Sequence, residues 1–133
     1  MRSYAIAYCA TAAVFFTLDF LWLSKIALGF YKSRIGDMMR DQPNFTAAGL
    51  FYLVYIVGIV YFAVSPALQN GSLLTAVVSG ALLGLIAYGT YDMTNLATLK
   101  SWSLTLSLVD MAWGTVLTAT AAGIGYLITS RFV

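Results

Sequence analysis

Four long apolar segments constrain the fold of this chain more than any other feature of its sequence. They cover about residues 4–28, 45–64, 73–99 and 104–128. A helix needs roughly 20 predominantly apolar residues to cross the hydrocarbon core of a bilayer, where an open structure would leave backbone polar groups unpaired. The sequence therefore predicts an all-α fold: one transmembrane domain over residues 1–133, built as an integral membrane four-helix bundle.

The composition supports this class and excludes several kinds of function. Of the 133 residues, 61% are apolar and 9% are charged, whereas about a quarter of the residues of a soluble domain are charged. The chain has no histidine and one cysteine, so the usual ligands of zinc and the usual hydrolase triads are missing. The basic residues are scattered rather than gathered in a stripe, which argues against nucleic acid as a partner.

The connections between the four segments carry turn and boundary signals. Residues 31–43 form a polar, interfacial connection, and Pro43 and Asn44 are typical of a helix start. We expect Pro66 to end the second helix, because proline disrupts a helix interior. The third connection is short, and its Trp102 suits the headgroup level of a membrane.

The distribution of basic residues predicts an orientation. Four crossings put both termini and the second connection on one side, and the first and third connections on the other. The terminal side carries Arg2 and Arg131, and the opposite side carries Lys25, Lys32, Arg34, Arg40 and Lys100. Since cytoplasmic loops are enriched in Lys and Arg, we expect the first and third connections in the cytoplasm and both termini in the periplasm.

Three aspartates, Asp19, Asp92 and Asp110, fall inside the apolar segments. An acid at the centre of a transmembrane helix costs about 2.5 to 3.5 kcal/mol on insertion scales, so its presence requires a reason. Counting residues along the first, third and fourth segments places the three side chains at similar depth, beside the first and third connections. Carboxylates close together in a low-dielectric site do not all ionise, and such a group is able to exchange a proton.

Each of these acids has a partner three residues further on, on the same helical face. The pairs are Asp19 with Trp22, Asp92 with Asn95, and Asp110 with Trp113. These six residues predict one pocket with indole walls and N–H donors. The second segment adds no charge, but its tyrosines supply either hydroxyl groups to the pocket or packing surface; they are Tyr52, Tyr55 and Tyr61.

A structural role is the alternative for the same acids. In that interpretation, they pair with Lys25 or Lys100, or accept hydrogen bonds across helices, and so fix the order of the helices. The available hydrogen-bonding partners are Tyr88, Thr90, Thr94 and Asn95. The sequence leaves the two interpretations open.

Small residues indicate which helices pack closely. Gly80 and Gly84 lie four residues apart on the third segment, and Gly114, Thr118 and Ala122 repeat at the same spacing on the fourth. Such residues let helix backbones approach each other in a membrane, where lipid gives no hydrophobic drive for association. We expect the third and fourth helices to form a tight pair, although the same surfaces could join two protomers.

The polar segments also resemble a known family. Residues 17–22 (Thr-Leu-Asp-Phe-Leu-Trp), 91–100 (Tyr-Asp-Met-Thr-Asn-Leu-Ala-Thr-Leu-Lys) and 108–114 (Leu-Val-Asp-Met-Ala-Trp-Gly) are similar to the bacterial membrane proteins classed as domain of unknown function 2177. The resemblance covers nearly the whole chain. It implies a four-helix, multi-pass protein of the bacterial inner membrane, found in lipid-modification gene neighbourhoods, and it implies no established activity.

Three functions are consistent with these sequence features. The leading hypothesis is binding or transport of a cation, a proton or an amphipathic, lipid-like ligand at the six pocket residues, with membrane lipids as partners and a homodimer if the protein transports. The alternative is an accessory subunit of a larger lipid-modifying, electron-transfer or pigment complex. An enzyme is disfavoured, because no nucleophile motif accompanies the acids. Three carboxylates also suit a divalent ion, but nearby lysines argue against one, so we expect no metal and no cofactor.

Overall fold

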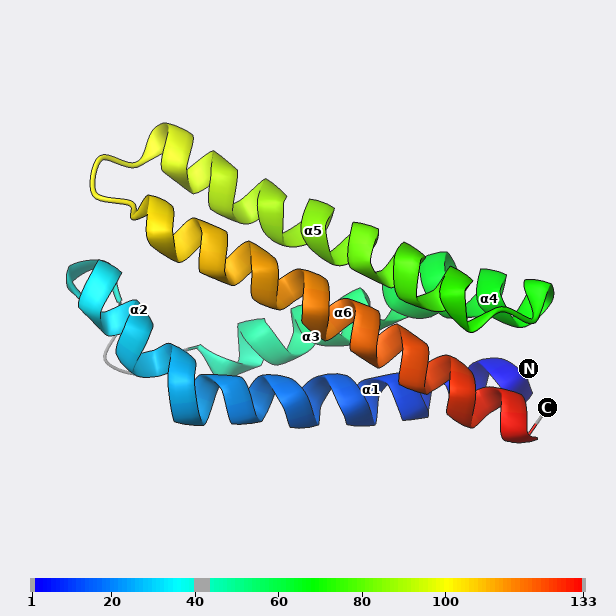
Figure 1. Ribbon diagram of the computed structural model, residues 1–133. Coiled ribbons are helices and arrows are strands. Elements are labelled where there is room, and N and C mark those ends of the chain that lie inside the picture. Colours follow the sequence, from blue (N-terminus) through cyan, green and yellow to red (C-terminus); the bar gives the residue numbers. More distant parts are fainter. Residues whose placement is uncertain (1, 40–43, 133) are drawn as a thin grey trace.

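The computed structural model describes residues 2–39 and 44–132. Four helices in it are long and apolar enough to cross a membrane: Arg2–Met38, Phe45–Asn70, Leu73–Thr98 and Leu104–Phe132. The described residues form no strand, so the prediction of an all-α membrane bundle is confirmed. Both termini and the turn between the second and third crossings lie at one end of the bundle, here called the terminal end (Figure 1). The opposite end is called the loop end.

The first crossing is longer than predicted and changes helix type on the way. It consists of α1 (Arg2–Trp22), the π-helical η1 (Leu23–Ala27), α2 (Leu28–Ile35) and the 3-10 turn η2 (Gly36–Met38). In η1 the hydrogen bonds span five residues, as from the Leu28 N–H to the Leu23 carbonyl. The segment expected as a polar connection is therefore helical through residue 38, because nothing in residues 29–38 removes a backbone donor. Figure 1 shows α2 bending back toward α6.

The second crossing does not end at Pro66, so that prediction is wrong. It consists of α3 (Phe45–Ile59), the π-helical η3 (Val60–Val64) and α4 (Ser65–Asn70). Pro66 lies in the first turn of α4, directly after the π-helical turns. The helix continues through Pro66 because the π-helical turn before it, in which the Ser65 N–H donates to the Val60 carbonyl, relieves the clash and the missing donor that a proline would impose on a regular α-helix.

The actual ends of the second crossing follow standard capping chemistry. The Asn44 side chain accepts a hydrogen bond from the Ala47 N–H at the start, which satisfies a free backbone donor. Gly71 ends α4 with φ of 64°, in the left-handed region that glycine adopts without strain. The expected start at Asn44 is confirmed, whereas Pro43 and the basic Arg40 lie outside the described residues.

The third and fourth crossings, α5 (Leu73–Thr98) and α6 (Leu104–Phe132), form the closest helix pair. A Cβ atom at Gly80 would lie 2.9 Å from both the Ala122 Cβ and the Thr118 carbonyl oxygen. A Cβ atom at Gly84 would overlap the backbone of Gly114. These glycines therefore allow the backbones to touch, and the predicted tight pair is confirmed.

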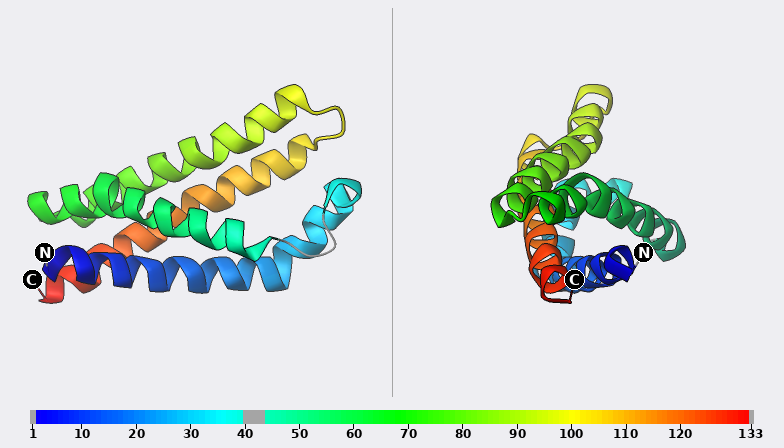
Figure 2. Two further views of the ribbon diagram at one scale, coloured as in Figure 1. Left: turned by 180° about the vertical axis from the view of Figure 1, so that it is seen from behind. Right: turned by 90° about the vertical axis from the view of Figure 1, so that its right-hand side faces the viewer.

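The buried apolar core occupies the middle and the terminal end of the bundle. It is built mainly from alanine, valine and isoleucine, together with Phe15, Leu117 and Tyr126. Toward the loop end, α1 and α6 diverge (Figure 2). This divergence leaves room between the helices that the apolar core does not fill.

Candidate functional site

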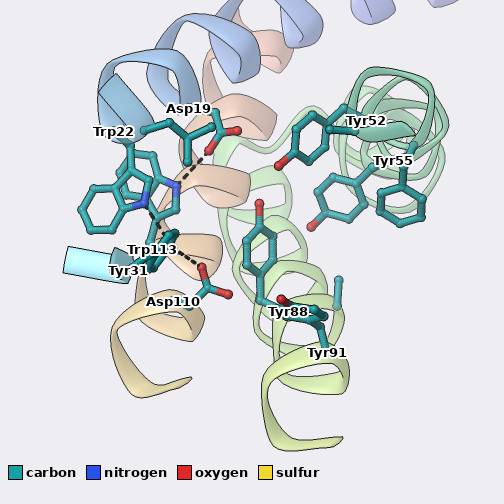
Figure 3. A pocket seen from close by; sticks show the side chains of 13 residues that line it. Asp19, Trp22, Tyr31, Tyr52, Tyr55, Tyr88, Tyr91, Asp110 and Trp113 are labelled. Atoms are coloured by element: carbon teal, nitrogen blue, oxygen red, sulfur yellow. Dashed lines mark hydrogen bonds between the residues drawn. The ribbon is translucent and has the colours of Figure 1, made fainter. Parts of the chain in front are cut away.

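A cavity of about 520 Å³ opens between the diverging helices near the loop end. All four crossings contribute to its wall. Its lining residues are Asp19, Trp22, Leu23, Tyr31, Ala48, Phe51, Tyr52, Tyr55, Ala87, Tyr88, Tyr91, Asp110 and Trp113. Figure 3 shows the two carboxyl groups on one side of the cavity and the tyrosines of α3 and α5 on the other. Aromatic rings thus form most of a wall that also holds two acids.

Asp19 points inward because it ends a buried stripe of α1. The buried residues of this helix are Ala7, Thr11, Phe15 and Asp19, each four positions after the last, and residues at that spacing share one helical face. Asp19 is only 6% exposed, and its Oδ1 accepts a hydrogen bond of 3.2 Å from the Trp113 indole Nε1–H. A carboxyl group on α1 is therefore held by a side chain of α6.

A hydrogen-bonded chain holds the second acid, Asp110 on α6. The Tyr31 hydroxyl of α2 donates to the Asp110 Oδ1 at 2.5 Å, and the Trp22 Nε1–H donates to the Tyr31 hydroxyl at 3.5 Å. The rings of Trp22 and Trp113 stack with centroids 4.5 Å apart and planes 9° apart. These contacts join α1, α2 and α6 into one wall of the cavity.

Four tyrosines form the facing wall: Tyr52 and Tyr55 on α3, and Tyr88 and Tyr91 on α5. The hydroxyls of Tyr52 and Tyr88 are directed toward the space between the two carboxyl groups (Figure 3). The Tyr55 hydroxyl lies 2.9 Å from the Thr118 Oγ1 and shares a hydrogen bond with it.

The Tyr88 ring packs against Gly114, where a Cβ atom would overlap it. Close packing of α5 on α6 and the position of the Tyr88 ring therefore depend on the same glycine.

Asp92 lies outside this lining. It is fully buried, and within the described part of the chain neither of its carboxyl oxygens has a hydrogen-bonding partner. Asp110 is close enough to interact with it electrostatically. Its backbone carbonyl accepts a hydrogen bond of 3.1 Å from the Ser107 hydroxyl, which in turn accepts one of 2.8 Å from the Trp102 indole. Asp92 therefore sits behind Asp110, beside the connection from α5 to α6.

The structure brings four of the six predicted site residues to the cavity: Asp19, Trp22, Asp110 and Trp113. Asp92 and Asn95 do not line it. Tyr52 and Tyr55 contribute to the wall, whereas Tyr61 is 70% exposed and lies elsewhere. In the described residues, the hydrogen-bonding partners of Asp19 and Asp110 are aromatic side chains rather than Lys25 or Lys100.

The sequence-based reasoning missed two tyrosines of the wall, Tyr31 and Tyr91, together with four apolar wall residues, and it considered Tyr88 only as a structural hydrogen-bonding partner. The four apolar residues are Leu23, Ala48, Phe51 and Ala87. Tyr31 falls in the segment predicted as a polar connection, but it is helical and faces the cavity. It follows the buried Ala27 by four residues, but the burial of Ala27 is a property of the folded chain, so no pattern in the sequence marks Tyr31 as a wall residue. For Tyr88 and Tyr91, no signal separates a wall tyrosine from a packing tyrosine.

The arrangement offers particular binding chemistry. Two carboxyl groups, several hydroxyls and aromatic faces surround the cavity, and none of the Lys and Arg residues in the ranges 2–39 and 44–132 lines it. Among the described residues, no three His, Cys, Asp or Glu side chains gather as a metal site would require. The cavity is thus suited to a molecule with both apolar surface and a polar group, which is the usual composition of a small-molecule site.

Comparison with known proteins identifies the family. The chain matches no curated protein sequence and no solved structure. The family model described as "Predicted membrane protein (DUF2177)" matches residues 4–127, a range that includes every residue of the cavity wall. Together with the four membrane-spanning helices, this match shows that the chain is a multi-pass membrane protein that belongs to the DUF2177 family.

Proposed function

We propose that the cavity binds a lipid-like, amphipathic molecule within the membrane. The observation that carries this proposal is a cavity of about 520 Å³ whose wall combines two acids with a surround of aromatic rings. Ionisable groups inside a membrane face a bundle interior or a cavity and commonly mark a path or site for a ligand. A purely structural role for Asp19 and Asp110 does not account for the cavity that both residues line.

The wall continues onto the outer surface of the bundle, which supports entry from the lipid. Phe51 lines the cavity and exposes 63% of its surface, and Leu23 lines it with 39% exposed. An acyl chain that lies against these two side chains would stay in contact with lipid. Its polar group would then reach the two carboxyl groups inside.

We further propose that the protein lies in the bacterial inner membrane, with the loop end in the cytoplasm and both termini in the periplasm. Lys25, Lys32 and Arg34 are exposed at the loop end, in agreement with the enrichment of basic residues on the cytoplasmic side. A C-terminal alkaline phosphatase fusion should be active and a C-terminal green fluorescent protein fusion dark. The reverse pattern would invert the proposed orientation without affecting the cavity.

Occupancy of the cavity tests the binding proposal directly. The protein is purified in a maltoside detergent, and native mass spectrometry measures how many lipid molecules remain bound. Ala48 lines the cavity from α3, so Ala48→Phe should fill part of it and remove a bound lipid. Ala47 is exposed on the same helix and does not line the cavity, so Ala47→Phe is the matched control.

We expect one retained lipid in the wild type and in Ala47→Phe, and none in Ala48→Phe. Equal retention by all three proteins would show that the lipid binds elsewhere and would refute the proposal. Thermal unfolding of each variant confirms that both remain folded, so that loss of lipid is assigned to the filled cavity.

A further inference from the structure

We propose that the polar group of this ligand is an organic ammonium ion, either a primary amine or a quaternary ammonium headgroup. The proposal rests on the proposed binding function and names the class of ligand for the same cavity. It follows from the charge, the aromatic faces and the size of the site.

The charge of the wall favours a cation. Asp19 is 6% exposed and Asp110 is 9% exposed, and the lining formed by the described residues contains no basic side chain. A carboxylate removed from water takes up a proton unless an opposite charge or several hydrogen bonds stabilise its charged form, and a bound cation would supply that opposite charge. The hydrogen bonds from Tyr31 and Trp113 both use an Oδ1 atom. The Tyr52 hydroxyl also lies near Asp19, and Asp92 lies near Asp110, so a ligand donor would reach the two Oδ2 atoms beside these groups.

The aromatic rings favour an organic cation over other charged groups. The stacked pair of Trp22 and Trp113 lies beside the carboxyl groups, and Tyr52 and Tyr88 face them across the cavity (Figure 3). A cation over the face of an aromatic ring is attracted by the ring quadrupole, and this attraction is strongest where water is excluded. Aromatic cages recognise alkylammonium groups; here Trp22 and Trp113 stack on each other, so their outer faces and the rings of Tyr52 and Tyr88 are the aromatic surfaces left for a cation.

The size of the site and the number of metal-ligating side chains gathered in it argue against a bare metal ion. A cavity of about 520 Å³ is far larger than an ion that is bound directly by its ligands at about 2.0 to 2.6 Å. The described residues contain no cluster of three metal-ligating side chains. An anionic headgroup would meet two carboxyl groups and no basic partner among the residues that the structure places at the wall, so an ammonium group is the polar group that the wall fits best.

Three single-chain amphiphiles separate charge from apolar binding: dodecylamine, dodecyltrimethylammonium and dodecanol. The first two are cations at neutral pH, and dodecanol has the same chain with an uncharged hydroxyl group. The Trp102→Phe protein in maltoside micelles serves as the reporter, because its remaining tryptophans, Trp22 and Trp113, both line the cavity. Tryptophan fluorescence during titration then reports on the cavity, and Ala48→Phe in the same background gives the signal from detergent partitioning alone.

We expect saturable fluorescence changes with both cations, at concentrations about tenfold lower than with dodecanol, as for one charge-assisted interaction. Asp19→Asn and Asp110→Asn should each remove most of this preference, because they weaken binding of the cations far more than binding of dodecanol. Both substitutions keep a side-chain oxygen that accepts the bonds from Trp113 and Tyr31, and retained dodecanol binding shows that the cavity is intact. Asp37 is exposed in η2, so Asp37→Asn should bind all three probes as the wild type does.

The outcomes distinguish this proposal from the one on which it rests. If no probe gives a saturable change beyond that of Ala48→Phe, the cavity does not bind amphiphiles and both proposals fail. If dodecanol binds as tightly as the two cations, the binding function stands and the ammonium proposal is overturned. Saturable binding of Ca²⁺ alone that Asp19→Asn abolishes would also overturn it, because the carboxyl groups would then serve a metal ion.

Discussion

The two ends of the bundle pack side chains of different size. At the terminal end, small side chains meet small side chains: Gly80 faces Ala122, and Gly125 packs directly against Thr11. At the loop end, large rings and two carboxyl groups fill part of the space and leave a cavity. The helices converge in the first region and separate in the second (Figure 2).

The comparison shows how side-chain size alone can create a site in a membrane bundle. Because lipid gives no hydrophobic drive for helix association, close backbone contact depends on small residues. Once glycines fix α5 on α6, rings placed further along the same helices keep the other crossings apart. The tightly packed half is therefore a support for the open half, and substitutions in the two halves should have different consequences.

The largest effect is expected from a substitution in the tightly packed half. Gly80→Val should reduce the free energy of unfolding by about 3 kcal/mol, because overpacking a rigid contact forces the backbones apart. Reversible unfolding in mixed micelles, followed by circular dichroism, measures the change. A Cβ atom at Gly58 would meet nothing within 4 Å, so Gly58→Val is the control. Equal losses in both variants would mean that the close contact of α5 and α6 does not hold the bundle together.

A smaller effect is expected where the two halves meet. Gly114→Ala should cost about 2 kcal/mol through contact of the new methyl group with the Tyr88 ring. In a Tyr88→Ala background the same substitution should cost less than about 0.5 kcal/mol, since the ring is gone and the two changes are coupled. A double-mutant cycle of unfolding free energies checks this coupling. Additive values would show that Gly114 and Tyr88 act independently.

In the open half, the attachment of α2 to α6 should depend on the hydroxyl group of Tyr31. No residue of α2 is buried, and the hydroxyl of Tyr31 links it to Asp110. Tyr31→Phe should cost about 1 kcal/mol, the typical net value of a hydrogen bond, and should increase amide hydrogen exchange in residues 28–35. Ser33→Ala removes a hydroxyl that bonds only within α2 and should leave exchange unchanged. Unchanged exchange in Tyr31→Phe would show that α2 is held by other contacts.

The smallest effect is expected for a similar phenol outside the cavity. The Tyr8 hydroxyl donates to the Leu53 carbonyl at 3.0 Å in an exposed position. Tyr8→Phe should cost about 0.5 kcal/mol, at the lower end for a protein hydrogen bond, and should leave binding of dodecylamine as in the wild type. A loss as large as that of Tyr31→Phe would erase the distinction between the two regions.

Much of the fold follows from the sequence because hydropathy and helix length are properties of single segments. The four crossings, the start at Asn44 and the tight contact through Gly80 and Gly84 were all predictable. The wrong end at Pro66 has a physical cause. A proline is expected to end a regular α-helix. Nothing in the preceding residues predicts the π-helical turns that accommodate this one.

The sequence predicts the depth of the site residues in the membrane but not the direction in which their side chains point. Residue counting placed Asp19, Asp92 and Asp110 in one layer of the membrane, and two of them share the cavity. The direction of Asp92 depends on the rotation of α5 about its axis, which close packing on α6 determines and which counting does not give. Tyr31 reaches the cavity through the bend between α1 and α2, a tertiary feature that the pattern of residues does not reveal.

The π-helical segment Leu23–Ala27 has one more consequence for this architecture. Successive residues of an α-helix are rotated by roughly 100° about the axis, whereas a π-helical turn holds about one residue more than an α-helical turn and so absorbs an extra residue. Deleting one residue from Leu23–Ala27 would let this segment close as a regular α-helix with the Tyr31 phenol on nearly the same face. Deleting a residue from the α-helical stretch between Leu28 and Tyr31 would instead rotate the phenol by roughly 100°, away from α6.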